Sequence, residues 1–84
     1  MVWNDMKLKI ELQAYLMQYS PNGAATFEIE MPEGSKVWDL VKKLAVPEEL
    51  ASIIVVGGVN AAYDHPLRDG DHVTLIPPLS GGEG

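Results

Sequence analysis

The sequence has no cysteine, half as many basic as acidic residues, and no long apolar run. Without cysteine the chain has no disulfide framework, no thiolate nucleophile and no thiolate metal ligand, so it must fold by packing alone. No apolar segment approaches the roughly 20 residues needed to span a bilayer, and the first residues lack the basic flank and apolar stretch of a signal peptide. We therefore expect a soluble, cytoplasmic protein that does not insert into a membrane.

The charge balance indicates the kind of partner. Six basic residues stand against twelve acidic ones, which gives a formal net charge of −6. This charge opposes binding to the phosphate backbone of nucleic acids and favours a partner with a basic surface. At 84 residues, the chain makes one small domain, near the size at which a single hydrophobic core is only just sufficient.

Apolar and polar residues alternate over two segments in the first third of the chain. Residues 7–16 place every second side chain, that of Ala14 included, on an apolar face, and residues 26–31 repeat the pattern. This period of two predicts a half-buried strand in each segment. The turn-forming sequence Ser-Pro-Asn-Gly at residues 20–23 separates them, so the two strands should form a hairpin.

A helix is expected next. Apolar residues recur at helical spacing from Val37 to Leu44, and Ser35 is placed to cap the first turn. This pattern predicts a helix of about ten residues that ends before Pro47, because the residue preceding a proline disfavours helical geometry. Residues 47–50 should open a further short helical turn.

The second half of the chain is predicted to be mainly strand. Residues 53–56 are a continuous β-branched run, which is consistent with a strand covered on much of both faces. Residues 60–63 should pair weakly, and residues 72–76 should form the last strand. The order of elements predicts an α+β fold, with one main helix across one face of a small sheet.

Three motifs of the chain resemble one family. Residues 67–73, LRDGDHV, are similar to its L-x-D-G-D-x-V turn and strand, residues 77–82, PPLSGG, to its P-P-V-S/A-G-G end, and residues 32–35, PEGS, to the loop before its helix. The chain thereby resembles, over residues 7–82, the MoaD/ThiS family of ubiquitin-like β-grasp sulfur carriers. Its diproline is more similar to the MoaD-type small subunit of molybdopterin synthase than to the thiamin-pathway carriers.

The resemblance implies both a fold and a division of the chain. The fold is a β-grasp, with a mixed sheet of four to five strands packed on one main helix. The expected parts are an N-terminal extension at residues 1–6, the β-grasp domain at residues 7–78, and a flexible C-terminal tail with the diglycine at residues 79–84.

The function that the resemblance implies is sulfur transfer, with the chain as a co-substrate rather than an enzyme. An E1-like adenylating enzyme of the MoeB/ThiF type would activate the carboxylate of Gly82 with ATP, and sulfur from a donor would displace AMP to give a thiocarboxylate. The thiocarboxylate would give its sulfur to a pterin precursor on the MoaE-type large subunit of molybdopterin synthase, in molybdopterin or tungstopterin synthesis. The chain needs no cofactor of its own. Gly81 and Gly82 suit this role because side chains would obstruct a narrow channel.

Two departures from the family pattern stand out. Gly57 occupies a position where the family commonly has asparagine, and both residues tolerate left-handed turn geometry. Glu83 and Gly84 follow the diglycine, whereas the carriers usually end on the second glycine. We expect a protease to remove Glu83 and Gly84 before Gly82 is activated; alternatively, Gly84 is itself the activated residue.

Partner contacts are expected where the tail begins. If Val73 and Leu75 point into the core, strand alternation turns Ile76 outward, where it joins Leu79 as exposed apolar surface. Trp38, beside the apolar stripe of the helix, is either a boundary packing residue or an interface anchor. The predicted partner-binding residues are Ile76, Pro77, Pro78, Leu79 and Ser80.

The sequence offers little for catalysis or metal binding. His65 falls in a loop and His72 near the start of a strand, and without cysteine or an obvious third ligand both are interpreted as ordinary surface or structural residues. Ser80 has no plausible neighbouring base. Glu48 and Glu49 are adjacent in sequence and therefore do not face each other on a helix. We predict no catalytic residue and no metal site.

Three alternative functions remain open from the sequence. The chain can be a ThiS-like carrier for thiamin thiazole synthesis, a ubiquitin-like modifier whose activated glycine is joined to lysines of target proteins, or a β-grasp interaction domain with an inert tail. The first two share the activation step with the favoured function.

Overall fold

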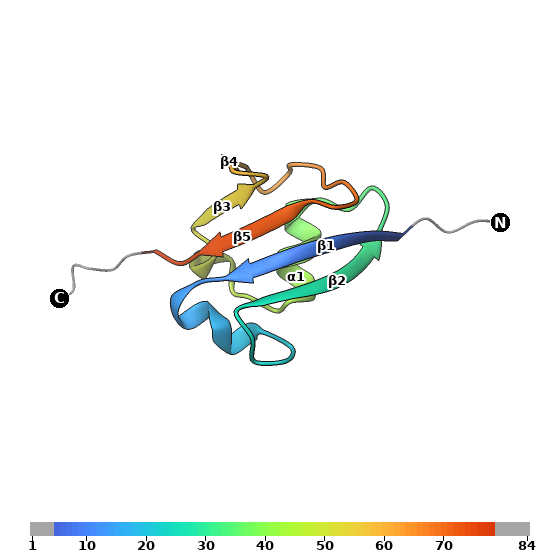
Figure 1. Cartoon of the computed structure of the whole chain (residues 1–84). Coiled ribbons are helices and arrows are strands. Elements are labelled where there is room, and N and C mark those ends of the chain that lie inside the picture. The colour runs from blue at the N-terminus through green and yellow to red at the C-terminus, as the bar shows by residue number, and fades with distance from the viewer. Residues whose placement is uncertain (1–4, 79–84) are drawn as a thin grey trace.

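Within residues 5–78, which the computed structural model describes, five strands form a mixed sheet in the order β2-β1-β5-β3-β4. One main helix, α1 (Val37–Lys43), packs across one face of the sheet, and the other face is left open (Figure 1). The strands are β1 (Asp5–Leu12), β2 (Thr26–Pro32), β3 (Ile53–Val56), β4 (Val59–Asn60) and β5 (His72–Ile76). Two short 3-10 helices complete the described elements, η1 (Ala14–Tyr19) and η2 (Glu48–Leu50). The α+β, ubiquitin-like β-grasp prediction is confirmed.

The core lies between the sheet and α1. Alternate residues of β1 point inward, as the period of two requires, and β2 pairs with β1 as the expected antiparallel hairpin. β1 also pairs with β5, in parallel, so β1 and β5 form the middle of the sheet. The largest fully buried side chains are Leu8, Ile10, Leu12, Leu16, Val37, Leu40, Val73 and Leu75.

The Asp-Gly-Asp turn fixes the parallel pairing of β1 and β5. The carboxylate of Asp69 accepts a hydrogen bond from the backbone N–H of Lys7 at 2.7 Å, and the N–H of Gly70 donates to the carbonyl of Lys7 at 2.8 Å. The carboxylate of Asp71 accepts from the N–H of Arg68 at 2.8 Å, which closes the turn on itself. Gly70 has φ of +87°, a left-handed geometry that glycine adopts without strain. The motif therefore holds the start of β5 against β1.

The first strand is shorter than the alternation predicts. The prediction of one strand over residues 7–16 is wrong in its second part, because β1 ends at Leu12 and η1 begins at Ala14. Ala14 has φ of +55°, so the backbone turns out of the strand there. Ala14 is consequently exposed, whereas Leu16 reaches the core from η1 and is fully buried.

The main helix differs from its prediction at both ends. α1 has seven residues and its N-cap is Lys36, not Ser35. The hydroxyl of Ser35 donates instead to the carbonyl of Pro32 at 2.7 Å, and the carboxylate of Asp39 accepts from the N–H of Lys36 at 2.9 Å. The helix stops early because Ala45 adopts φ of +61°, a left-handed residue just beyond the C-cap. Among the described residues, no helix is long and apolar enough to cross a membrane.

Most of the remaining elements follow the predicted positions, but the weak pairing expected at residues 60–63 is wrong in its bounds, because the turn after β3 brings Val59 and Asn60 back against it at once. η2 occupies residues 48–50, where a short helical turn was expected, and β3 and β5 have the predicted bounds. Gly57 and Gly58, with φ of +60° and +87°, join β3 to the two-residue strand β4. Both values are left-handed, which explains why asparagine and glycine are equivalent choices at position 57.

Candidate docking surface at the end of the last strand

Strand β5 divides its side chains between the core and the open face of the sheet. Val73 and Leu75 are fully buried, whereas Thr74 and Ile76 lie on the opposite face and are half-buried. This confirms the predicted alternation, and it places Ile76 on the open face at the last position of the strand.

The neighbour of Ile76 on this face is Ile53. β3 pairs with β5 in an antiparallel register that sets Ile53 opposite Ile76 and Val55 opposite Thr74. Side chains in such pairs lie within contact distance on one face of the sheet. We call Ile53, Val55, Thr74 and Ile76 the open-face patch. Ile53 remains 42% exposed, so the patch presents apolar surface to solvent beside the end of β5.

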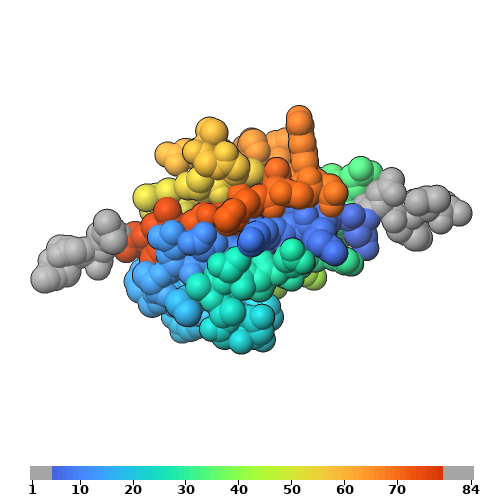
Figure 2. Space-filling model, in the orientation of Figure 1, coloured from blue at the N-terminus to red at the C-terminus, as the bar shows by residue number. Residues whose placement is uncertain are grey.

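The far end of the same face is charged. Lys7 lies opposite Glu30 and Lys9 opposite Glu28 on the neighbouring strands β1 and β2, which lie side by side in Figure 2. The ring nitrogen Nε2 of His72 lies 3.4 Å from a carboxylate oxygen of Glu11. Glu11 lies beside Thr74 of the open-face patch, so the His72–Glu11 pair borders the patch and the lysine–glutamate pairs occupy the face beyond it.

The chain leaves the sheet beside the open-face patch. The N–H of Gln13 donates to the carbonyl of Leu75 at 3.2 Å, where β1 turns into η1. Beyond Ile76, Pro77 has no N–H with which to continue the ladder, so β5 ends there. Pro77 is buried and Pro78 half-buried, which fixes the point of departure against the body of the protein.

The predicted site residues fall into two groups. Ile76, Pro77 and Pro78 are placed by the structure around the end of β5. The others lie outside the described residues: Leu79, Ser80, Gly81, Gly82, Glu83 and Gly84.

Ile53 and Val55 are site residues that the sequence did not identify. The run at residues 53–56 predicted a strand covered on much of both faces, and for Ile53 this is wrong. β3 alternates in burial, with Ile54 and Val56 facing the core. A continuous apolar run does not say which of its members face a partner, and the sequence carried no signal for the register of β3 on β5.

Trp38 lies on the helix side of the sheet in an aromatic contact. Its ring meets that of Tyr63 edge to face, with centroids 6.0 Å apart, and the Nζ of Lys42 lies 4.4 Å from the centre of the Trp38 ring. Trp38 is 39% exposed. It therefore packs at a boundary, as one of its two expected roles required, and keeps an accessible surface.

The two histidines lie at the surface. His65 and His72 are both exposed, and the backbone carbonyl of His65 accepts from the N–H of Val37 at 3.0 Å, at the start of α1. Over the part of the chain that the structure describes, His, Asp and Glu side chains form no group of three or more that is able to hold a metal ion.

Known proteins resemble this chain in sequence and in structure. The ThiS family model matches residues 11–82. A Pyrococcus furiosus protein provisionally assigned as molybdopterin converting factor, subunit 1, is 30% identical, with a TM-score of 0.69 over 88% of this chain and 99% of that one. SAMP1 from Haloferax volcanii is 22% identical, with a TM-score of 0.69 over 90% and 99% of the two chains. The small archaeal modifier protein 1 of Methanosarcina acetivorans is 21% identical, with a TM-score of 0.66 over 94% and 99%.

Proposed function

The chain belongs to the ThiS family of β-grasp sulfur carriers, which are not catalytic enzymes, and we propose that it carries sulfur as a thiocarboxylate on Gly82 for molybdopterin or tungstopterin synthesis. The first partner in this proposal is an E1-like adenylating enzyme, the kind of partner that the family implies. The proposal also places the protein in the cytoplasm and treats residues 7–78 as the body and residues 79–84 as the reactive arm.

The observation that carries the proposal is the position of the open-face patch. Ile53 and Ile76 expose apolar surface where the chain leaves the sheet toward the diglycine. Leu79 to Gly82 are four residues, which extend at most about 13 Å. A partner that binds the patch therefore holds the activated carboxyl within reach of its own active site, and the chain supplies binding and delivery.

The chemistry needs no reactive side chain from this protein. In the first step the carboxylate of Gly82 attacks ATP, which gives an acyl adenylate and pyrophosphate. In the second step sulfide-level sulfur, delivered by the donor as hydrosulfide, attacks the acyl carbon and AMP leaves, so the glycine retains one oxygen and gains one sulfur. Adenylation supplies the leaving group that a carboxylate lacks, and the absence of cysteine from the chain is compatible with both steps.

Two features support the pterin pathway over the thiamin pathway. The first is the diproline before the diglycine, and the second is the 30% identity to the Pyrococcus furiosus protein. The second partner is then a MoaE-type large subunit, whose active site receives the thiocarboxylate. A ThiS-like role in thiazole synthesis is the nearest alternative, since it uses the same activated arm.

Reconstitution tests the proposal. The chain ending at Gly82 is incubated with the E1-like enzyme of its organism, ATP and a sulfur donor, and its intact mass is followed. We expect one oxygen to be replaced by sulfur, and molybdopterin to form when the large subunit and a cyclic pterin precursor are added. A chain that lacks Gly81 and Gly82 is the control and should give neither product.

Three outcomes would contradict the proposal in different ways. Failure to form the adenylate with the organism's E1-like enzymes would indicate a β-grasp domain with an inert tail. A thiocarboxylate that serves thiazole but not pterin synthesis would move the chain to the thiamin pathway. Conjugates on lysines of other proteins, with no thiocarboxylate, would identify a ubiquitin-like modifier.

A further inference from the structure

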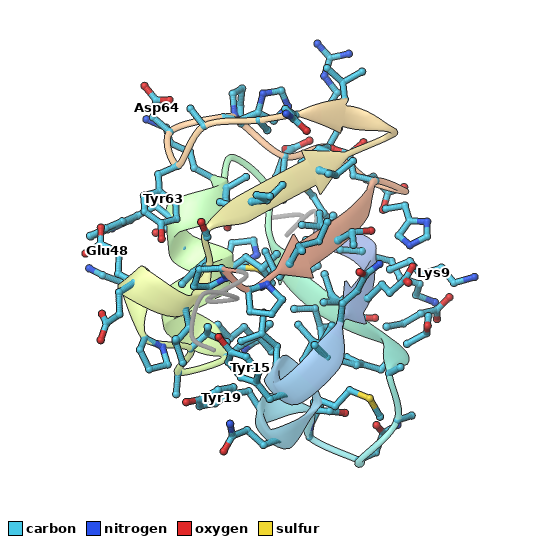
Figure 3. The ribbon with its side chains drawn as sticks, turned by 90° about the vertical axis from the view of Figure 1, so that its left-hand side faces the viewer. Lys9, Tyr15, Tyr19, Glu48, Tyr63 and Asp64 are labelled. Carbon is cyan, nitrogen blue, oxygen red and sulfur yellow. The ribbon has the colours of Figure 1, made fainter. Side chains whose placement is uncertain are left out.

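A groove of about 380 Å³ lies on the helix side of the sheet, away from the open-face patch. Ala51, Ile54, Ala61 and Ala62 give it an apolar floor, and η2 forms one of its walls. Ile54 belongs to the core face of β3, so the groove is separated from the patch by the thickness of the sheet. Figure 3 shows Glu48 and Tyr63 on the side of the molecule opposite to Lys9, which stands on the open face.

Tyr63 holds this groove in shape. Its hydroxyl lies 2.7 Å from the carbonyl oxygen of Glu48 and 3.3 Å from that of Ala51, and donates its hydrogen to this pair. Its own carbonyl accepts from the N–H of Trp38 at 2.8 Å. The residue therefore ties η2 and the start of α1 to the loop after β4. A cavity fixed in this way is preformed, which lowers the cost of binding.

The groove has an acidic rim. Glu48 and Glu49 are exposed and line it, and within residues 5–78 neither carboxylate is part of an ion pair. Burial, and after it the charges of Glu48 and Glu49, raises the pKa of Tyr63. The negative charges of Glu48 and Glu49 therefore reach the Tyr63 hydroxyl, and all three residues line the same groove.

We propose that the groove binds a lysine or arginine side chain from a basic segment of a partner protein. Such a side chain has an aliphatic stem and a charged end, so the stem can cover the floor of Ala51, Ile54 and Ala61 while the cation meets Glu48 and Glu49. An aromatic face beside the cation adds to the attraction, as Lys42 already shows on Trp38. The net charge of −6 also favours a basic partner.

The charges favour this occupant over the chain's own C-terminal residues. Residues 79–84 contribute the carboxylate of Glu83 and no cation, so the acidic rim would repel them. The alternative occupant is a lysine side chain from a second copy of this chain. The test below distinguishes it from a partner protein by the concentration dependence of the protein alone. The inference goes beyond sulfur transfer, and its readout involves neither Gly82 nor a thiocarboxylate, so the two proposals can fail separately.

The test is a titration of the full-length, isotope-labelled chain followed by amide chemical shifts. The probe is the capped peptide acetyl-Gly-Lys-Gly-Arg-Gly-amide, and its counterpart with two glutamates is the negative control. We expect saturable shifts at Ala51, Ile54, Ala61, Ala62 and Tyr63 with the basic peptide, weakened by salt, and none with the acidic peptide. Reversing the rim, Glu48→Lys with Glu49→Lys, should lower the affinity about tenfold or more.

A matched variant separates the groove from the general charge of the protein. Glu28→Lys with Glu30→Lys makes the same change in net charge on exposed positions of β2 and should keep the affinity for the basic peptide within about twofold of the wild-type value. Equal losses in the two double variants, or shifts centred on the open face, would overturn the proposal. So would groove shifts that appear on concentrating the protein alone, which would assign the groove to a second copy. Should the lysine pair at the rim prevent folding, Glu48→Gln with Glu49→Gln keeps the side-chain shape and should still weaken binding.

Discussion

Ile53 and Ile76 lie directly opposite each other on β3 and β5, on the face of the sheet that α1 leaves open. Ile76 is the last residue of β5, so this pair stands where the chain departs toward the diglycine. The pair joins residues that are far apart in sequence into one apolar surface. In the proposed function, this surface is what the activating enzyme recognises before it reaches the carboxyl of Gly82.

Removing the apolar surface of the patch should weaken recognition by the activating enzyme. We expect Ile53→Ala with Ile76→Ala to raise the KM for adenylation about tenfold and to leave kcat nearly unchanged, because the lost apolar contact affects binding alone. Loss of the cross-strand pair should cost about 1 kcal/mol of stability. Steady-state pyrophosphate release measures the first effect and urea unfolding the second.

Val59 offers the matched control for the patch. It is 67% exposed and lies opposite Val56, hence on the other face of the sheet. Val59→Ala removes exposed apolar surface of the same kind and should leave the KM unchanged. An unchanged KM in the double isoleucine variant would show that the enzyme does not use the patch.

The Asp-Gly-Asp turn should contribute to stability rather than to sulfur transfer. Asp69→Ala removes the acceptor of the Lys7 N–H and should lower the free energy of unfolding by about 1 kcal/mol, since a charge-assisted hydrogen bond is lost at a partly solvated site. Asp64→Ala, at another exposed aspartate in a turn, is the control and should change little. If the two variants unfold at the same urea concentration, the turn does not hold β5 against β1 as described.

Tyr63 should make the stability of the protein depend on pH in the alkaline range. Burial, followed by the charges of Glu48 and Glu49, raises the pKa of Tyr63 above its usual value of 10.0. Above the unfolded pKa, the folded state therefore binds more protons than the unfolded state, and the free energy of unfolding falls as pH rises. The contribution is fully present below about pH 10 and is lost as pH passes through the raised pKa.

The variant Tyr63→Phe isolates this effect. At pH 8 it should be less stable than the wild type by about 1 kcal/mol, because the hydroxyl no longer donates to the carbonyls of Glu48 and Ala51. Urea unfolding at increasing pH should show the difference shrinking above about pH 10, since the variant has no phenol to ionise there. Parallel losses of stability in both proteins would refute the assignment. Tyr15→Phe, on a ring that is 48% exposed, controls for hydroxyl removal at pH 8.

Local pattern predicted much of this fold and little of its surface. The alternation of β1 and β5 and the spacing of α1 follow from side-chain periods that are visible in sequence. The end of β1 at Leu12 could not be predicted, because the alternation of apolar and polar residues continues in the sequence to Leu16. The strand ends earlier because Ala14 adopts a left-handed backbone conformation. The start of α1 depends on the Asp39 carboxylate, which accepts from the N–H of Lys36, and its end depends on the left-handed backbone of Ala45.

The candidate site divides in the same way. Ile76 could be predicted from its place in β5, and the diglycine from its motif. Ile53 could not, because its partner depends on the register of two strands that are distant in sequence. Tyr63 was missed for a similar reason, since its hydroxyl bonds to a carbonyl 15 residues away and its segment has no marked pattern.

Whether Gly82 carries sulfur is decided by the intact mass of the protein isolated from its native cell. We expect a chain that ends at Gly82, without Glu83 and Gly84, and in which a fraction of molecules has one carboxyl oxygen replaced by sulfur. Digestion should place this sulfur on the C-terminal peptide. A thiocarboxylate on Gly84 of an untrimmed chain would move the site, and a chain found only on lysines of other proteins, with no thiocarboxylate form, would contradict the account.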